Sequence, residues 1–147
     1  MSRITDIVDA VAAELNTGVA ADKFSLSFVA ARHYVPRFNL EDMADLHVTI
    51  VPRGVEQAKA SRVLLQSDVQ VDVAVQKKLD ACSLAEVDEL MGLVEEISDF
   101  LRTNRLSACS QASWVRAENV PVYSQEHLDQ YRQFTSVVTL TFRVMSQ

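Results

Sequence analysis

The first repeating pattern of apolar residues predicts an amphipathic helix near the start of the chain. These residues recur at the i, i+3, i+4 and i+7 spacing that places them on one helical face. Gly18 follows them, where such a helix would end. The apolar positions are Ile4, Ile7, Val8, Val11, Ala12 and Leu15.

A second helix is predicted from residue 84 onward. The segment Ser83-Leu84-Ala85-Glu86 has the form of a capping box, in which the hydroxyl accepts from a first-turn amide and the glutamate reaches back. The other face of this helix is acidic, which is typical of a face in contact with solvent. The expected buried stripe comprises Leu84, Val87, Leu90, Met91, Val94, Ile97 and Leu101. The acidic face comprises Asp88, Glu89, Glu95, Glu96 and Asp99.

Five segments alternate apolar and polar residues with the period of two that is typical of strands. In the longest, residues 63–75, the odd positions are mostly valine and the even positions are mostly glutamine and aspartate. Pro36 marks the end of the first segment, and Pro52 and Gly54 are expected to close the second. The five segments are 24–34, 46–50, 63–75, 111–115 and 134–144.

The order of these elements predicts an α+β fold in a single domain over residues 1–147. We expect a mixed, mostly antiparallel sheet of about five strands with two helices packed on one face, in the order α-β-β-β-α-β-β. The 147 residues fit one domain of about 150 residues. Residues 36–45 show neither periodicity and predict an irregular connection, and residues 124–129 predict a short polar turn or helix.

Composition and charge narrow the classes of function. The hydrophobic share of 48% and the charged share of 23% are typical of an ordinary folded domain. The 14 Lys and Arg against 20 Asp and Glu give a net charge of −6, which disfavours broad binding to nucleic acid. No apolar run is long enough to span a bilayer, and the first residues open an amphipathic pattern rather than a signal peptide. We therefore expect no membrane partner.

The sequence predicts no catalytic, cofactor-binding or metal site. It contains no G-x-S-x-G, no P-loop, no G-x-G-x-x-G and no H-E-x-x-H. His33, His47 and His127 have no His or Cys at the spacing of metal ligands. Cys82 and Cys109 lie far apart in the chain and are expected to be free thiols.

Two groups of charged residues are candidates for contact surfaces. Asp68 and Asp72 share one face of the longest strand, about 13 Å apart at about 3.3 Å per residue, which is too far for a catalytic pair. This polar face is either solvated or lines a channel or a subunit contact. Arg53, Lys59 and Arg62 form a small basic patch in the expected connection between the second and third strands, with a merely solvated loop as the alternative.

The irregular segment at residues 36–45 is a further candidate. It carries Arg37 and two apolar residues, Phe38 and Leu40. Loops commonly carry contacts with partners. The alternative is that the apolar side chains pack beneath the loop as a small satellite core.

The amphipathic first helix and four later segments together resemble a known group of virion proteins. The segments are a long strand at residues 67–75, the end of the acidic helix at residues 97–101, and residues 123–128 leading into a strand at 134–142. They read SDVQVDVAV, ISDFL, YSQEHL and FTSVVTLTF. This order resembles the small proteins of tailed bacteriophages that close the tail or join it to the head, the tail-terminator, tail-completion and neck group.

The resemblance implies a non-enzymatic subunit of a ring, commonly a hexamer, in the tail or neck of a virion assembled in the host cytoplasm. Its implied partners are further copies of the chain, the tail tube protein and the head–tail connector proteins, with DNA only passing through the lumen. It implies no cofactor. In such a ring Asp68 and Asp72 are candidates to face the lumen. The candidate contacts with neighbouring subunits or tail proteins are Arg37, Phe38, Leu40, Arg53, Lys59 and Arg62.

Two other interpretations remain open from the sequence. The chain has the composition of a small α+β enzyme or ligand-binding domain, with a pocket between sheet and helices and His33 or His47 as its titrating group. The other is a ring subunit of a bacterial contractile injection machine.

Overall fold

The computed structural model describes residues 2–34, 45–79 and 83–146. Within these ranges the chain forms three α-helices, a short 3-10 helix and one five-stranded sheet. The predicted α+β class is therefore confirmed. In chain order the elements are α1 (Arg3–Ala20), β1 (Ala30–Arg32), β2 (His47–Lys59), β3 (Leu65–Lys78), α2 (Leu84–Thr103), η2 (Ser107–Cys109), β4 (Ser113–Glu118), α3 (Gln125–Tyr131) and β5 (Gln133–Ser146).

The strands lie side by side in the order β1-β2-β3-β5-β4. The pair β1–β2 is parallel and the other three pairs are antiparallel, so the sheet is mixed and mostly antiparallel, as predicted. The centre of the sheet is the pair β3–β5, which runs without interruption from Leu65↔Ser146 to Lys78↔Gln133. The last strand in the chain therefore occupies an interior position.

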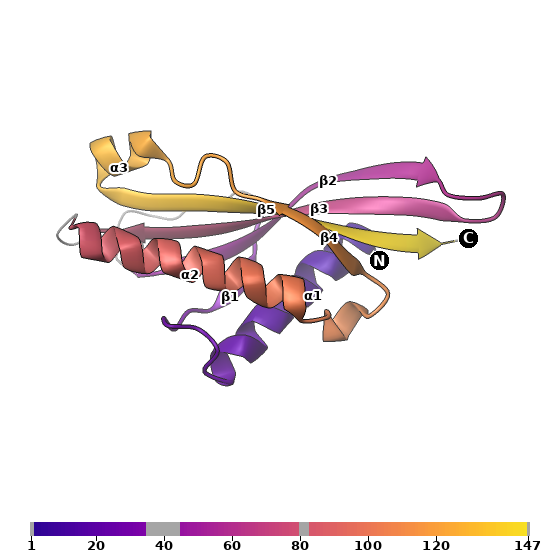
Figure 1. Cartoon of the computed structure of the whole chain (residues 1–147), viewed down its shortest axis with the longest axis horizontal. Helices are drawn as coiled ribbons and strands as arrows, with labels where there is room; N and C mark the ends of the chain where they lie inside the picture. Colours follow the sequence, from indigo (N-terminus) through magenta and orange to yellow (C-terminus); the bar gives the residue numbers. More distant parts are fainter. Residues whose placement is uncertain (1, 35–44, 80–82, 147) are drawn as a thin grey trace.

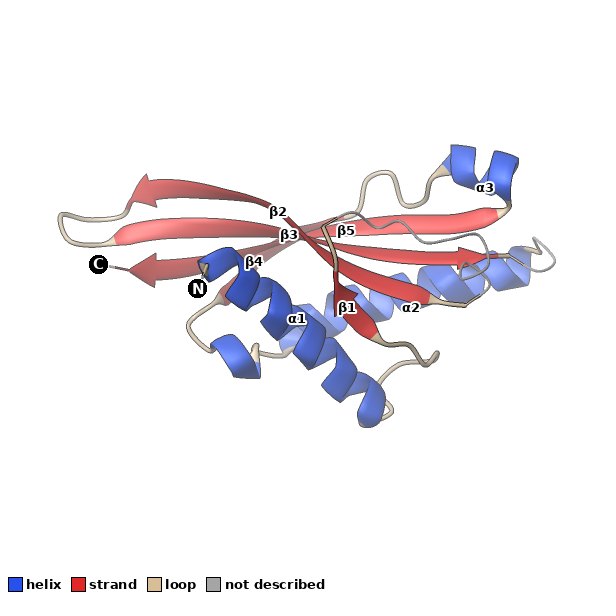
Figure 2. Ribbon diagram, turned by 180° about the vertical axis from the view of Figure 1, so that it is seen from behind, coloured by secondary structure: helices blue, strands red, loops and turns tan. Residues whose placement is uncertain are grey.

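The two long helices, α1 and α2, lie on the same side of the sheet, whereas α3 lies across one end of the other side (Figures 1 and 2). The alternation in β3 explains this layering, because its odd-numbered valines face the helices and are completely buried. The core between sheet and helices includes Val69, Val71, Val73 and Val75 of β3, Ile7, Val8, Val11 and Leu15 of α1, and Leu93, Ile97 and Leu101 of α2.

The first strand is much shorter than predicted, because only Ala30–Arg32 pairs with β2. Phe24 and Phe28 turn into the core instead, and the ring of Phe24 lies 5.2 Å from that of Phe28 and 5.1 Å from that of Phe100, between centroids. Asn16 of α1 binds both the backbone N–H and the carbonyl of Ala30 through its side-chain amide. The alternation at residues 24–28 therefore reflects an aromatic cluster and not a strand.

The second strand is longer than predicted, because Pro52 and Gly54 do not end it. β2 continues to Lys59, and its register with β3 shifts between Pro52 and Gly54. Such a bulge accommodates a proline, since the ladder is already interrupted there. The fourth strand is also displaced from its predicted range of 111–115 and begins at Ser113.

The hydroxyl hydrogen bond of the predicted capping box is present at the start of α2, whereas the first residue predicted for the buried stripe is not buried. Ser83 Oγ accepts a hydrogen bond from the Glu86 N–H at 3.3 Å. Leu84 is 84% exposed, so its assignment to the buried stripe is wrong. The stripe starts one turn later, where Val87 packs against the core. Residues 124–129, predicted as a polar turn or helix, form most of α3, which Ser124 caps.

Three strands extend beyond α2 as a narrow projection (Figure 1). We call it the arm, and define it as residues 55–68 of the β2–β3 hairpin with residues 143–146 of β5. All residues from 55 to 63 are exposed. The first turn of α1 braces the arm beyond its base, because Arg3 Nη1 donates to Ser67 Oγ at 3.3 Å and Arg3 Nη2 donates to Ser146 Oγ at 3.5 Å. These two serines lie opposite Gln57 and Leu65 in the strand ladder. The remainder of the described chain is called the body.

Candidate functional site

The side of the sheet opposite α1 and α2, here called the polar face, carries both acids singled out from the sequence. Asp68 and Asp72 lie on it as predicted, and the register of β5 sets Arg143 opposite the first and Thr139 opposite the second. The polar face comprises Glu56 of β2, Asp68, Gln70 and Asp72 of β3, Thr139, Thr141 and Arg143 of β5, and Arg116 and Glu118 of β4. Four strands thus contribute to one polar surface.

Asp68 forms a two-point ion pair with Arg143. Nε of Arg143 donates to Oδ1 at 2.8 Å, and Nη2 donates to Oδ2 at 3.2 Å. The amide of Gln66, with its oxygen turned toward Arg143, accepts from Nε and Nη2 at 3.2 Å. The hydrogen bond from Arg143 lowers the pKa of Asp68 below its ordinary value and raises the pKa of Arg143. Asp68 is therefore ionised and neutralised by a neighbour.

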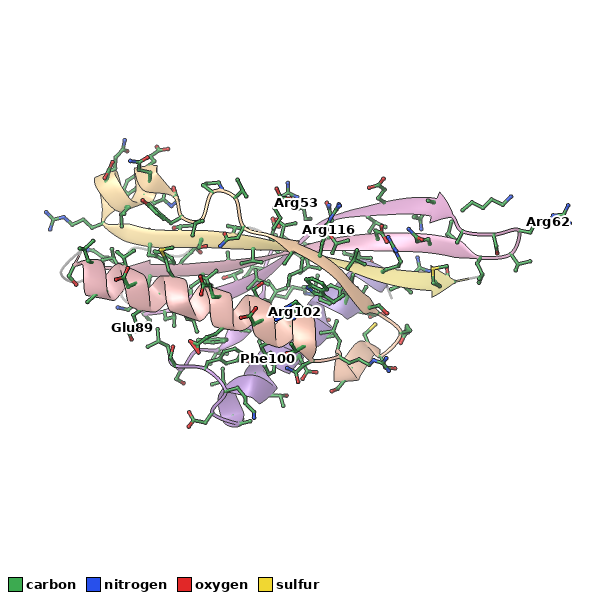
Figure 3. The ribbon with its side chains drawn as sticks, viewed as in Figure 1. Arg53, Arg62, Glu89, Phe100, Arg102 and Arg116 are labelled. Atoms are coloured by element: carbon green, nitrogen blue, oxygen red, sulfur yellow. The ribbon has the colours of Figure 1, made fainter. Side chains whose placement is uncertain are left out.

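Asp72 is also bound on both oxygens. Oδ1 accepts from Thr139 Oγ1 at 2.7 Å, and Oδ2 lies 3.4 Å from Nη1 of Arg53. Arg53 sits at the bulge of β2, and Figure 3 shows it pointing away from the helices together with Arg116. Each acid is thus paired with an arginine, so the polar face presents alternating, nearly balanced charge. The negative electrostatic potential of this surface is therefore weaker than two unpaired carboxylates would produce.

The three residues of the predicted basic patch do not lie in one loop. Arg53 and Lys59 belong to β2, and Arg62 lies in the turn that joins β2 to β3. Arg53 is occupied by Asp72, whereas Lys59 and Arg62 are exposed near the end of the arm. The patch predicted as a connection is therefore divided between the polar face and the arm tip, because β2 continues through its proline.

Both edges of the sheet leave backbone groups without a strand partner among the described residues. β1 covers β2 only at Val48, Thr49 and Ile50. No strand formed by the described residues pairs with the outer side of β2 from residue 51 to residue 59, or with the outer side of β4. Unpaired edges are ready templates for pairing with another chain. These two edges differ in length and sequence, so they are two different surfaces.

A mostly apolar pocket, here called the α2 pocket, lies beside the first turns of α2. Its volume is about 220 Å³. The apolar part is formed by Leu26, Leu46 and Leu90, and the charged rim by Lys77, Glu86 and Glu89. Lys77 Nζ lies 3.8 Å from Glu86 Oε1, so these two charges offset each other and Glu89 leaves the rim negative.

Groups able to support catalysis or bind a metal are scattered in the described part of the chain. No three of its His, Cys, Asp and Glu residues form a group that could hold a metal ion. His127 Nδ1 contacts Thr135 Oγ1 at 2.9 Å and so anchors α3 to β5. Cys109 is a free thiol, as predicted, and it is buried. Burial raises its pKa, which keeps it protonated and unreactive.

Four predicted residues lie outside the described ranges. These are Cys82, expected to be a free thiol, and the candidate contacts Arg37, Phe38 and Leu40. Sequence reasoning missed three polar-face residues that the sheet register brings beside the acids. They are Thr139 and Arg143 on β5 and Arg116 on β4. In the sequence, only the alternation of residues 134–144 indicates that Thr139 and Arg143 share a face.

Comparisons with known proteins add no assignment. No model of a known protein family matches the chain, and no curated protein matches it. None of the described helices combines the length and apolar character that crossing a membrane requires.

Proposed function

We propose that this chain is a non-enzymatic virion structural protein that forms a ring, terminating a phage tail tube or joining the tail to the head. The proposal rests on the resemblance of the element order to the tail-terminator, tail-completion and neck group. Its expected partners are further copies of the chain, the tube protein and the connector proteins, with DNA passing through the lumen.

The observation that carries the proposal is the pair of unequal sheet edges that the described strands leave unpaired. One runs along residues 51–59 of β2 and the other along β4. Two different surfaces on one chain support head-to-tail contacts, and such contacts form a ring when the rotation between neighbours closes. Both edges belong to the same sheet as the polar face, so neighbours joined by them would align their polar faces.

In such a ring the polar face is the surface we assign to the lumen. DNA passing through needs a wall that does not retain phosphates. Arginines alone would retain them, but Asp68 and Asp72 engage Arg143 and Arg53 through hydrogen bonds and ion pairs. The acids therefore act by neutralising their arginine neighbours rather than by repelling DNA from a distance.

The ring is tested by the mass of the purified protein, measured by light scattering over a concentration series, with electron microscopy of the same samples. We expect a discrete mass near six chains and annular particles. A protein that is monomeric at every concentration, and that also fails to bind isolated tail tubes, would contradict the proposal.

The lumen assignment is tested by reversing the two acids. Asp68→Lys with Asp72→Lys is expected to make the polar face strongly basic, so that assembled particles bind duplex DNA in fluorescence anisotropy at low salt. The matched control, Glu95→Lys with Asp99→Lys, changes the net charge equally but on the exposed face of α2, on the other side of the sheet. Asp68→Asn with Asp72→Asn also leaves the arginines without their acidic partners, but it changes the net charge by a smaller amount. This variant is expected to bind DNA more weakly than the double lysine variant. Equal DNA binding by the reversed and control proteins would exclude this role.

A further inference from the structure

The arm ends in an ordered turn that presents one apolar and two basic side chains. Ser61 Oγ accepts from the backbone N–H groups of Val63 and Leu64, and the N–H groups of Ala60 and Ser61 donate to the Leu64 carbonyl. Val63 is 69% exposed at this tip. Arg62 is its neighbour, and Lys59 ends β2 on the way into the turn. An exposed valine flanked by cations is a surface that suits an apolar hollow with an acidic rim.

The α2 pocket has the complementary character. Its lining of leucines is large enough at about 220 Å³ for a valine side chain, and Glu89 gives its rim a net negative charge. Figure 3 places Arg62 at the far tip of the arm and Glu89 on α2 toward the opposite end of the molecule. The tip of a chain therefore cannot reach the pocket of the same chain.

We infer that the arm tip of one copy docks in the α2 pocket of a second copy, with Val63 among Leu26, Leu46 and Leu90 and with Arg62 against Glu89. This inference rests on the proposed function, because it names one contact between ring neighbours. The contact is heterologous, so every copy offers one tip and one pocket. The contact lies on the side of the sheet that carries α1 and α2. It is therefore separate from the pairing of sheet edges, and both contacts can form between the same two copies. Association through it weakens as salt rises, because the charges are exposed.

Charge exchange tests the pairing of Arg62 with Glu89 directly. Arg62→Glu and Glu89→Arg are each expected to weaken self-association about tenfold, because each replaces an attraction with a repulsion. The two substitutions in one chain restore association to near the wild-type value, since the pair is then reversed and intact. The readout is the association constant from sedimentation equilibrium, at low and high salt.

Matched controls distinguish the loss of this contact from a general effect of changing the charge of the protein. Arg105→Glu and Glu95→Arg make the same charge changes at exposed positions away from the tip and the pocket, and are expected to leave association nearly unchanged. Val63→Asp places a third carboxylate against the acidic rim and is expected to weaken association at least as much as Arg62→Glu. Circular dichroism establishes that each variant is folded.

The outcomes separate this contact from the ring itself. A wild-type ring that neither single variant weakens, or a double variant that does not recover, overturns the contact and leaves the ring in place. Long open chains that respond to the variants as expected support the contact and contradict the ring. A wild-type protein without self-association overturns the contact, and binding to tail tubes then decides on the ring.

Discussion

The body and the arm are built from the same strands, yet they bury their residues very differently. In the body, β2 has three consecutive buried residues after His47, and two of them, Val48 and Ile50, belong to the core beneath the helices. In the arm, the same strand is exposed from residue 55 to its end. The strands of the hairpin have 13 and 14 residues, whereas strands of 3–10 are usual. The hairpin is therefore longer than the core requires.

The sequences of the body and of the arm are subject to different constraints. Residues of the body are fixed by packing, because the interior tolerates neither voids nor extra atoms. Residues of the arm beyond its base are free of that constraint within one copy. Their conformation is held by the strand ladder and by Arg3, which binds Ser67 and Ser146. We therefore expect substitutions in the body to change folding stability and substitutions at the arm tip to change association.

The largest expected difference is between two valines of the same sheet. Val73 is completely buried in the body, and Val55 is 47% exposed in the arm. Val73→Ala removes buried methyl groups and leaves a cavity, so we expect it to lower the free energy of unfolding by about 2–3 kcal/mol. Val55→Ala is expected to lower it by about 0.5 kcal/mol or less. Urea denaturation of both variants measures this, and similar losses would show that the arm is as tightly packed as the body.

Two helical glycines of the body differ in the space around them. A Cβ on Gly18 would lie 2.7 Å from Phe24 Cε2 and 2.9 Å from Phe100 Cζ, so Gly18→Ala is expected to destabilise by about 1–3 kcal/mol. A Cβ on Gly92 meets no atom within 4 Å, and Gly92→Ala is expected to stabilise by about 0.5–1 kcal/mol through its helix propensity. Thermal unfolding of the two variants should therefore shift in opposite directions. A stabilised Gly18→Ala would mean that the aromatic cluster is loosely packed.

The smallest effect is expected where the polar face enters the arm, at Asp68. Its pKa is lowered in the folded state, so its ion pair contributes stability above the ordinary value of about 3.8, and this is lost as the pH falls below that value. Asp68→Asn is expected to cost up to about 1 kcal/mol near pH 7, because the pair is half-exposed. The difference between variant and wild type in urea denaturation should shrink as the pH falls below 3.8 and through the lowered pKa of Asp68. Asp99→Asn serves as the control, because the ion pair between Asp99 and Arg102 is more exposed. An equal pH-dependent loss of stability in this control would contradict the prediction that the Asp68 ion pair contributes more than an exposed pair.

The sequence predicts the fold class well, because periodicity reports burial. The alternating valines of β3 are buried as expected, and the Ser83 cap begins α2 where predicted. The errors arise where a local signal competes with a distant contact. Phe24 and Phe28 alternate like a strand but pack with Phe100, and Pro52 signals a strand end although a bulge absorbs it.

The candidate surfaces are less predictable, since they depend on register between distant segments. The sequence places Asp68 and Asp72 on one polar face, and this is confirmed by their positions on β3. It cannot show that Arg143 lies opposite Asp68, because the two residues are 75 positions apart. The sequence also cannot suggest that the arm tip fits the α2 pocket, because the pocket is formed only when distant segments fold together.

The interior position of β5 has a consequence for how the protein reaches its folded state. β5 is the last of the described strands to be synthesised, but β3 and β4 both pair with it. Until it emerges, the valine-rich β3 has an open edge and β4 has no neighbour in the sheet. Contacts between such distant segments form slowly, and exposed strand edges promote aggregation in the meantime. The nascent chain therefore needs protection until β5 has emerged, and high expression temperatures should favour insoluble product.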